Sequence, residues 1–173
     1  FAAANPKRVV VVDEAYVDFG AESAVPLLSA HENLLVVATF SKSRSMAGAR
    51  LGFVIGPEAL IADLNRIRTA RNPYNVSSFA QALGLGVLTD QETVNDRCRL
   101  IALHRKFTVQ GLVMRGFEVL PSLANFVFAR HPDWPGDTLM NALRARGVLI
   151  RHFDRPRVRD WNRITIGTEE QML

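Results

Sequence analysis

Residues 36–56 read VVATFSKSRSMAGARLGFVIG, and this stretch decides how the chain is expected to fold. It begins within an apolar run, residues 34–38, and ends in a second one, residues 51–55. The polar segment between the two runs contains Thr39, Ser41, Lys42 and Arg50. Two buried strands around such a loop place the lysine at the end of a strand, where α/β sheets bind their ligands. The stretch therefore predicts an α/β sheet with a ligand site at its edge.

Lys42 is the candidate for covalent chemistry. We expect its amine to be buried, because a buried lysine shifts readily to its neutral form and can then react with an aldehyde to form a Schiff base. The neighbouring Thr39, Ser41 and Arg50 could bind an anionic group of the same ligand. The alternative is an ordinary surface lysine on a loop, which is what most lysines are.

A second polar group follows the β-branched run RVVVV at residues 8–12, which is typical of a strand buried on both faces. Asp13 comes directly after this run, where an unpaired buried carboxylate would be costly, so it needs a cationic or hydrogen-bonding partner. Tyr16 could place its hydroxyl on the same side. The alternatives are a cap for the next turn at Asp13 and a packing role for Tyr16.

The remaining pattern indicates two domains. Apolar periodicity predicts helices over residues 58–69, 78–88 and 91–114. Further on, short strands are expected at 117–120, 124–129, 148–152 and 163–166, with one helix at 137–146. We therefore expect residues 1–92 to form part of a larger α/β domain with a mostly parallel sheet. Residues 93–173 would form a smaller α+β domain, joined to the first through the long helix.

Arg151 and Arg163 lie on apolar segments of the second domain, LIRHF and NRITIG. Taken singly, each is expected to lie at a sheet edge or to extend its guanidinium into solvent. Two arginines on one small sheet could together bind a carboxylate or a phosphate through paired hydrogen bonds. The sequence thus offers a second candidate anion site.

Composition excludes several classes of function. The chain has 48% hydrophobic and 22% charged residues, as a soluble globular protein does, and no apolar run long enough to span a membrane. Its net charge of +4 is spread along the sequence, so we expect no nucleic-acid partner. The single cysteine, Cys98, excludes an internal disulfide and favours the reducing cytoplasm. We expect no metal site, and a chain that begins FAAANPKR without Met is expected to be an excised piece.

Taken together, the motifs resemble those of the pyridoxal-phosphate-dependent aminotransferases of the aspartate aminotransferase fold, and most closely the histidinol-phosphate branch. The motifs that carry the resemblance are DEAY (13–16), TFSK (39–42), AGARLG (47–52), RNPYNVSS (71–78), PSLANF (121–126) and RITIGT (163–168). The longer segment LIRHFDRPRVRDWNRITIGTEE (149–170) is the part most specific to that branch. The similarity covers essentially the whole chain.

The resemblance implies a role for each candidate in binding pyridoxal 5'-phosphate. Lys42 matches the lysine that binds the cofactor covalently and later shuttles a proton between the substrate Cα and the cofactor carbon. Asp13 matches the carboxylate that pairs with the pyridine nitrogen, and Tyr16 the hydroxyl beside the phenolic oxygen. The groups that match the phosphate ligands are Thr39, Ser41 and Arg50.

The resemblance also implies the substrates and the assembly. Arg163 matches the arginine for the acidic end of the substrate, with Arg151 as its companion for a phosphorylated substrate. The expected reaction is transamination between histidinol phosphate and 2-oxoglutarate, in a cytoplasmic homodimer. The alternatives within the fold are an aromatic amino-acid aminotransferase and a threonine-phosphate decarboxylase. The alternative of another class is an inert scaffold, and a nucleotide-binding protein is disfavoured because no GxGxxG or Walker-type loop is present.

This sequence departs from the family in one respect. The family's first half, with its phosphate-binding loop and the aromatic that stacks on the cofactor ring, has no counterpart here. We therefore expect the isolated 173-residue chain not to turn over substrate.

Overall fold

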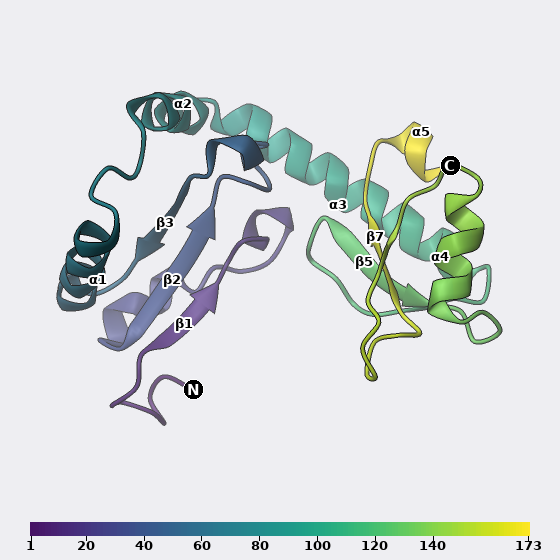
Figure 1. The fold of residues 1–173 in the computed structure, drawn as a ribbon, viewed down its shortest axis with the longest axis horizontal. Coiled ribbons are helices and arrows are strands. Elements are labelled where there is room, and N and C mark those ends of the chain that lie inside the picture. Colours follow the sequence, from purple (N-terminus) through teal and green to yellow (C-terminus); the bar gives the residue numbers. More distant parts are fainter. The chain divides into compact units, whose positions relative to one another are not determined.

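A computed structural model describes all residues, 1–173, and the chain divides into two compact units, Phe1–Asp96 and Arg97–Leu173. Each unit is described by itself. The division falls within the long helix α3 (Gln91–Val113), a few residues beyond the boundary expected at residue 92. Figure 1 shows the course of the elements.

The first unit is built on a three-stranded sheet in the order β1-β2-β3. Strands β1 (Val10–Asp13) and β2 (Leu34–Thr39) are parallel, whereas β3 (Gly52–Ile55) runs antiparallel to β2. The expectation of a mostly parallel sheet therefore holds for β1 and β2 and is wrong for β3. The reason is the short connection over residues 40–51, which contains no crossover helix and returns the chain directly alongside β2.

Burial in this sheet is confined largely to β2. Its residues Leu34, Leu35 and Val36 are buried. All of β3 is exposed, and in β1 the Val11 side chain is 56% exposed. The predictions that the flanking strands would be buried are thus wrong for this chain, because no layer of the first unit covers their outer apolar side chains.

Two of the predicted helices follow the sheet and are confirmed. Helix α1 spans Glu58–Arg71, and α2 spans Ser78–Thr89, where the Ser77 side chain caps the helix by accepting a hydrogen bond from the Ala80 amide. The buried residues of α2 are Ala80 and Gly84. A Cβ at Gly84 would lie 2.5 Å from Leu51 Cδ2, so the small residue lets α2 approach the end of the 40–51 loop.

The second unit contains a four-stranded antiparallel sheet in the order β4-β5-β7-β6. Its elements are β4 (Glu118–Val119), β5 (Phe126–Arg130), α4 (Gly136–Arg144), β6 (Arg151–His152), β7 (Asn162–Thr165) and α5 (Glu169–Met172). Burial alternates along the central strands: Val127, Ala129 and Asn162 are fully buried on one face. The expected α+β pattern is therefore present in this unit.

None of the helices is both long and apolar enough to span a membrane.

Candidate functional site

The candidate site lies where β1 and β2 end. Because these strands are parallel, with Asp13 beside Val37, their carboxyl ends meet at one edge of the sheet. Asp13 is the last residue of β1 and Thr39 the last residue of β2. The segments that follow carry Tyr16 and Lys42, so the structure brings the predicted cofactor residues of the first unit to the same edge.

The two carboxylates of the DEAY motif have different surroundings. Glu14 is buried and accepts hydrogen bonds from the Ser23 hydroxyl (2.8 Å) and the Ala24 amide, which fixes the following loop. Asp13 is exposed and accepts one hydrogen bond, at 3.0 Å, from the Ala15 amide. Asp13 therefore caps its turn, as the alternative interpretation predicts. It also forms no ion pair, which leaves carboxylate lone pairs available to a ligand.

Lys42 lies over the ring of Tyr16. The distance from its Nζ to the ring centroid is 5.5 Å, within the range of a cation–π contact. The Lys42 side chain is exposed, however, so the expectation of a buried lysine is wrong for this chain. The physical reason is that the loop projects beyond the edge of a sheet whose neighbouring strand β3 is itself exposed.

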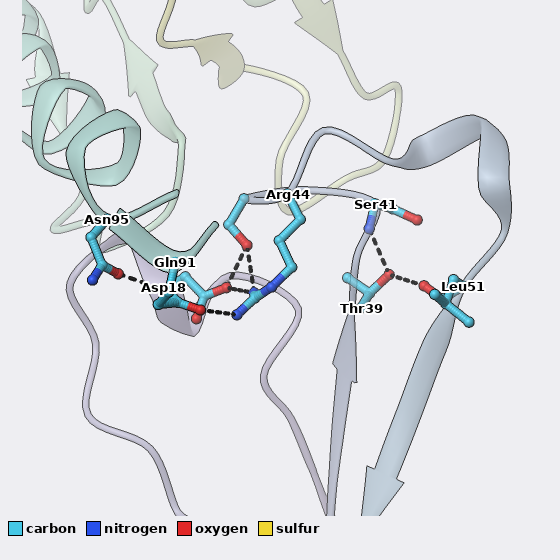
Figure 2. Close-up of polar contacts among 8 residues, drawn as sticks. Asp18, Thr39, Ser41, Arg44, Leu51, Gln91 and Asn95 are labelled. Atoms are coloured by element: carbon cyan, nitrogen blue, oxygen red, sulfur yellow. Dashed lines mark hydrogen bonds and ion pairs between the residues drawn. The ribbon is translucent and has the colours of Figure 1, made fainter. Parts of the chain in front are cut away.

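Thr39 closes the loop that carries the lysine (Figure 2). Its hydroxyl donates to the Leu51 carbonyl (3.3 Å) and accepts from the Ser41 amide (3.1 Å). One side chain thus joins the end of β2 to the start of β3. The Ser41 hydroxyl makes no hydrogen bond within the chain and is available to a ligand. The hydroxyl proton of Thr39, in contrast, is already donated to the Leu51 carbonyl.

Arg50 lies at the far end of this loop in a left-handed backbone conformation, with φ 53°. Ser45, in the same loop, has φ 56°. Residues other than glycine seldom adopt this conformation, which costs free energy and is concentrated at functional sites. The guanidinium donates one hydrogen bond to the Ala47 carbonyl (2.9 Å) and is otherwise exposed. It has donors left for an anion.

The structure adds residues that the sequence did not single out. Asp18, in the short 3₁₀ helix η1 (Val17–Phe19), accepts hydrogen bonds from the Ser43 hydroxyl and from Arg44 Nη1, the latter at 2.6 Å. Arg44 also donates to Gln91 at 3.4 Å, and its side chain is only 13% exposed. Figure 2 shows these contacts converging on the guanidinium.

These residues form what we call the Asp18–Arg44 clamp: Asp18, Ser43, Arg44 and Gln91. Ser43 and Arg44 directly follow Lys42, while Asp18 shares its segment with Tyr16. The clamp therefore ties the lysine loop to the segment that carries the tyrosine. The motif SKSR was visible in the sequence, but nothing there identifies Asp18, 25 positions away from Ser43, as its partner.

Arg151 and Arg163 lie on the sheet of the second unit. They face each other directly across β6 and β7, and neither forms an ion pair with a carboxylate. Arg151 is exposed on the edge strand β6, as the simpler interpretation of a strand arginine predicts. Arg163 lies on β7, an interior strand, and its Nε is buried without a hydrogen-bond partner.

A third arginine of this unit has a structural role. Arg105, in α3, is buried and donates to the Ala124 carbonyl at 2.7 Å. Burial lowers the pKa of its guanidinium from the usual value, because the charged form loses hydration.

The chain contains no cluster of three or more His, Cys, Asp or Glu side chains suited to a metal ion.

Comparison with known proteins identifies the family. The family model for aminotransferase class I and II matches residues 1–173. The chain belongs to this family. The candidate site at the end of β1 and β2 is therefore a site on an aminotransferase chain, and the α/β fold agrees with that of solved aminotransferases.

Several relatives of this aminotransferase chain share a more specific name. It is similar to histidinol-phosphate aminotransferase 1 of Bradyrhizobium diazoefficiens, with 55% identity over 98% of this chain and 48% of the relative. For the histidinol-phosphate aminotransferase of Acinetobacter baumannii the identity is 47%, over 97% of this chain and 46% of the relative. The crystal structure of histidinol-phosphate aminotransferase from Clostridium acetobutylicum aligns with a TM-score of 0.88 at 25% identity, covering 98% of this chain and 52% of that one.

The chain thus spans about half the length of the curated relatives it matches.

Proposed function

We propose that the protein is a pyridoxal-phosphate-dependent aminotransferase that transfers an amino group between histidinol phosphate and 2-oxoglutarate in histidine biosynthesis. The observation that carries this proposal is the 55% identity, over nearly the whole chain, to a relative that is named for histidinol phosphate. The residues at the carboxyl ends of β1 and β2 support it, because each retains the chemistry that the cofactor requires.

The fit to pyridoxal phosphate rests on the polar side chains gathered at the carboxyl ends of β1 and β2. The Asp13 carboxylate has lone pairs for the pyridine nitrogen, and Tyr16 lies next to the Lys42 amine. The Ser41 hydroxyl and the outer donors of Arg50 could hold the phosphate, with Thr39 bracing the loop. When bound, the cofactor supplies an aldehyde carbon and an electron-withdrawing ring.

The chain's own residues would then bind and orient the cofactor and would move protons. The negative charge of Asp13 would keep the pyridine nitrogen protonated, and the Tyr16 hydroxyl would donate a hydrogen bond to the ring. Lys42 Nζ would take the Cα proton of the amino donor and pass it to the cofactor carbon, and in the second half of the reaction it would carry a proton from that carbon to the Cα of the product amino acid. The loop contacts of Thr39 and the Asp18–Arg44 clamp keep that amine in place.

Arg151 and Arg163 are proposed to bind the acidic group of the substrate. Like charges that face each other across two strands repel each other, and no carboxylate of the chain relieves that repulsion. A phosphate or carboxylate bound between the guanidiniums would relieve it through charge-assisted hydrogen bonds. We further propose that the protein is cytoplasmic, because its single cysteine, Cys98, is buried and free. The homodimer is proposed because it is the assembly expected for the family.

The test uses the protein as its gene encodes it, assayed with histidinol phosphate, histidinol, phenylalanine and threonine phosphate as amino donors. A site built around an anion rejects a substrate that lacks it, so kcat/KM for histidinol phosphate should exceed that for histidinol by about 10³-fold or more. Preference for phenylalanine would favour the aromatic aminotransferase. Release of CO2 from threonine phosphate without glutamate would favour the decarboxylase, and no turnover of any donor would favour the inert scaffold.

A further inference from the structure

The sheet of the second unit has an unusual outer face. Strand β5 alternates, so that Val127 and Ala129 are buried on one side while Phe126, Phe128 and Arg130 lie on the other. Arg163 is paired with Phe128 across β5 and β7, and with Arg151 across β7 and β6. Arg130 on this face is paired with Glu118 of β4 at 2.7 Å, whereas Arg151 and Arg163 have aromatic neighbours and no carboxylate partner.

The ring of Phe153 is within cation–π distance of both candidate substrate arginines. The guanidinium carbon of Arg151 is 5.4 Å from the Phe153 centroid, and that of Arg163 is 6.0 Å from it. The guanidinium carbon of Arg163 also lies 5.3 Å from the Phe126 centroid. The Arg163 guanidinium thus contacts two aromatic rings.

Aromatic contacts hold an arginine differently from a carboxylate. A carboxylate would neutralise the guanidinium and occupy its N–H groups. A ring attracts the cation through its quadrupole and leaves the N–H groups at the guanidinium edge available. Since neither Arg151 nor Arg163 has an acidic partner, Phe153 fixes both cations while leaving their donors for an incoming anion.

We infer that Phe153 is a positioning residue for substrate binding: its ring spaces and orients Arg151 and Arg163 for the anionic group of the substrate. This inference rests on the proposed function, in which those arginines bind that group. Phe153 does not touch the substrate itself. It acts through the two guanidiniums, and Phe126 is a second aromatic contact of Arg163.

Packing alone is the rival explanation, because Phe153 also makes an edge contact with Phe128 at 6.2 Å. A control must therefore remove an equivalent ring that contacts no arginine. Phe117 meets this need: it is half-buried like Phe153, lies in the same unit, and packs edge-on against His131 at 5.0 Å. Phe117→Leu and Phe153→Leu are thus matched truncations.

The experiment measures kcat and KM for histidinol phosphate in the gene-encoded protein. We expect Phe153→Leu to raise KM by about 5- to 20-fold, the equivalent of a partly desolvated cation–π contact, with kcat within about twofold. Phe153→Tyr keeps the ring and should restore KM to within about twofold of the parent. Phe117→Leu should leave both constants nearly unchanged.

A second readout does not depend on turnover. Inorganic phosphate is titrated into the protein while the Nε–Hε NMR signals of its arginines are followed. The Arg163 and Arg151 signals should shift with phosphate in the parent and in Phe153→Tyr, and the apparent Kd should rise about 5- to 20-fold in Phe153→Leu.

The outcomes separate this inference from the proposed function. Arg163→Lys tests the arginine itself and should raise KM at least as much as Phe153→Leu. If Arg163→Lys raises KM and Phe153→Leu behaves like Phe117→Leu, the positioning role of Phe153 is overturned and the proposed function stands. If neither Arg163→Lys nor Arg151→Lys affects KM or the phosphate titration, the substrate assignment fails and the inference fails with it.

Discussion

At the scale of single residues, Arg44 does most to fix the loop that carries Lys42. Its guanidinium is paired with Asp18 at 2.6 Å, contacts Gln91 and lies 5.5 Å from the Phe40 ring centroid. Because the Arg44 side chain is only 13% exposed, its charge-assisted contact is expected to contribute more than an ion pair between two fully exposed side chains. The clamp is therefore expected to hold the loop in its strained conformation.

Replacing Arg44 by methionine should loosen the loop without unfolding the unit. Hydrogen exchange at the Ser45 and Met46 amides, which bond within the loop, should accelerate by about 5- to 30-fold, equivalent to about 1–2 kcal/mol. The matched control is Arg66→Met, which breaks the exposed pair with Asp63 on α1. That change should alter the hydrogen-exchange rate of the Ser45 and Met46 amides by less than about twofold. Equal effects of the two variants would contradict the clamp.

Asp13 caps its turn and is also proposed to pair with the ring nitrogen, and one substitution separates these two roles. Asn can still accept the hydrogen bond from the Ala15 amide, so Asp13→Asn should keep the turn and the stability. It removes the charge proposed for the ring nitrogen. We expect kcat of the gene-encoded protein to fall by about 10²-fold or more, while its Tm stays the same. A variant with parental kcat would leave Asp13 only its capping role.

At the scale of elements, the start of α4 lies close against the backbone that leads into β7. Gly136 begins α4, and its carbonyl accepts from Asn162 Nδ2 at 3.0 Å. A Cβ at Gly136 would lie 2.5 Å from the Arg159 carbonyl oxygen, a backbone atom with little freedom to move. Only glycine allows this approach.

Gly136→Ala should therefore destabilise the second unit by about 1–3 kcal/mol through overpacking. Both tryptophans, Trp134 and Trp161, belong to this unit, so denaturant unfolding followed by their fluorescence reports on it. The control is Gly111→Ala within α3, where the added Cβ meets only the end of the Arg115 side chain at 3.4 Å. Because alanine has a higher helix propensity than glycine, the Gly111→Ala variant should be at least as stable as the parent. Similar losses in the two variants would refute the contact argument.

The elements also show what the sequence could predict. Apolar periodicity located α1, α2 and α3 to within a few residues, and the β-branched runs located β1 and β2. The pattern could not give the direction of β3, because direction depends on how the 40–51 loop returns the chain.

The place of the candidate site in the chain could be predicted for a similar reason, whereas the contacts around it could not. Lys42, Asp13 and Tyr16 follow strand ends, and strand ends can be recognised in a sequence. The Asp18–Arg44 clamp and the Phe153 contacts join residues that are distant in the chain or belong to different strands, so local patterns do not reveal them. The expected burial of Lys42 failed because burial depends on which layers cover an element.

At the scale of the whole molecule, the apolar surface that remains exposed is the main feature. In the first unit, a groove of 420 Å³ runs between the loop end and α2, and it is lined mainly by apolar side chains, among them Phe40, Leu51 and Leu85. Concave apolar surface of this kind can bind a small apolar molecule. The 173-residue chain should therefore bind a hydrophobic dye.

Leu85→Gln should reduce the dye's fluorescence, because it makes the groove polar while keeping a good helix-forming residue. Leu103→Gln is the matched control: Leu103 is 61% exposed on α3, Leu85 is 67% exposed on α2, and only Leu85 lines the groove. Equal dye binding by both variants would show that the groove is not the binding surface.

The central claim is that Lys42 is the residue that binds pyridoxal phosphate covalently. The direct measurement is borohydride reduction of the gene-encoded protein with the cofactor bound, followed by proteolysis and mass spectrometry of the labelled peptide. The chain's other lysines, Lys7 and Lys106, lie in peptides that are easily distinguished. We predict the reduced cofactor on Lys42 alone. A label on any other lysine, or on none, would contradict the account.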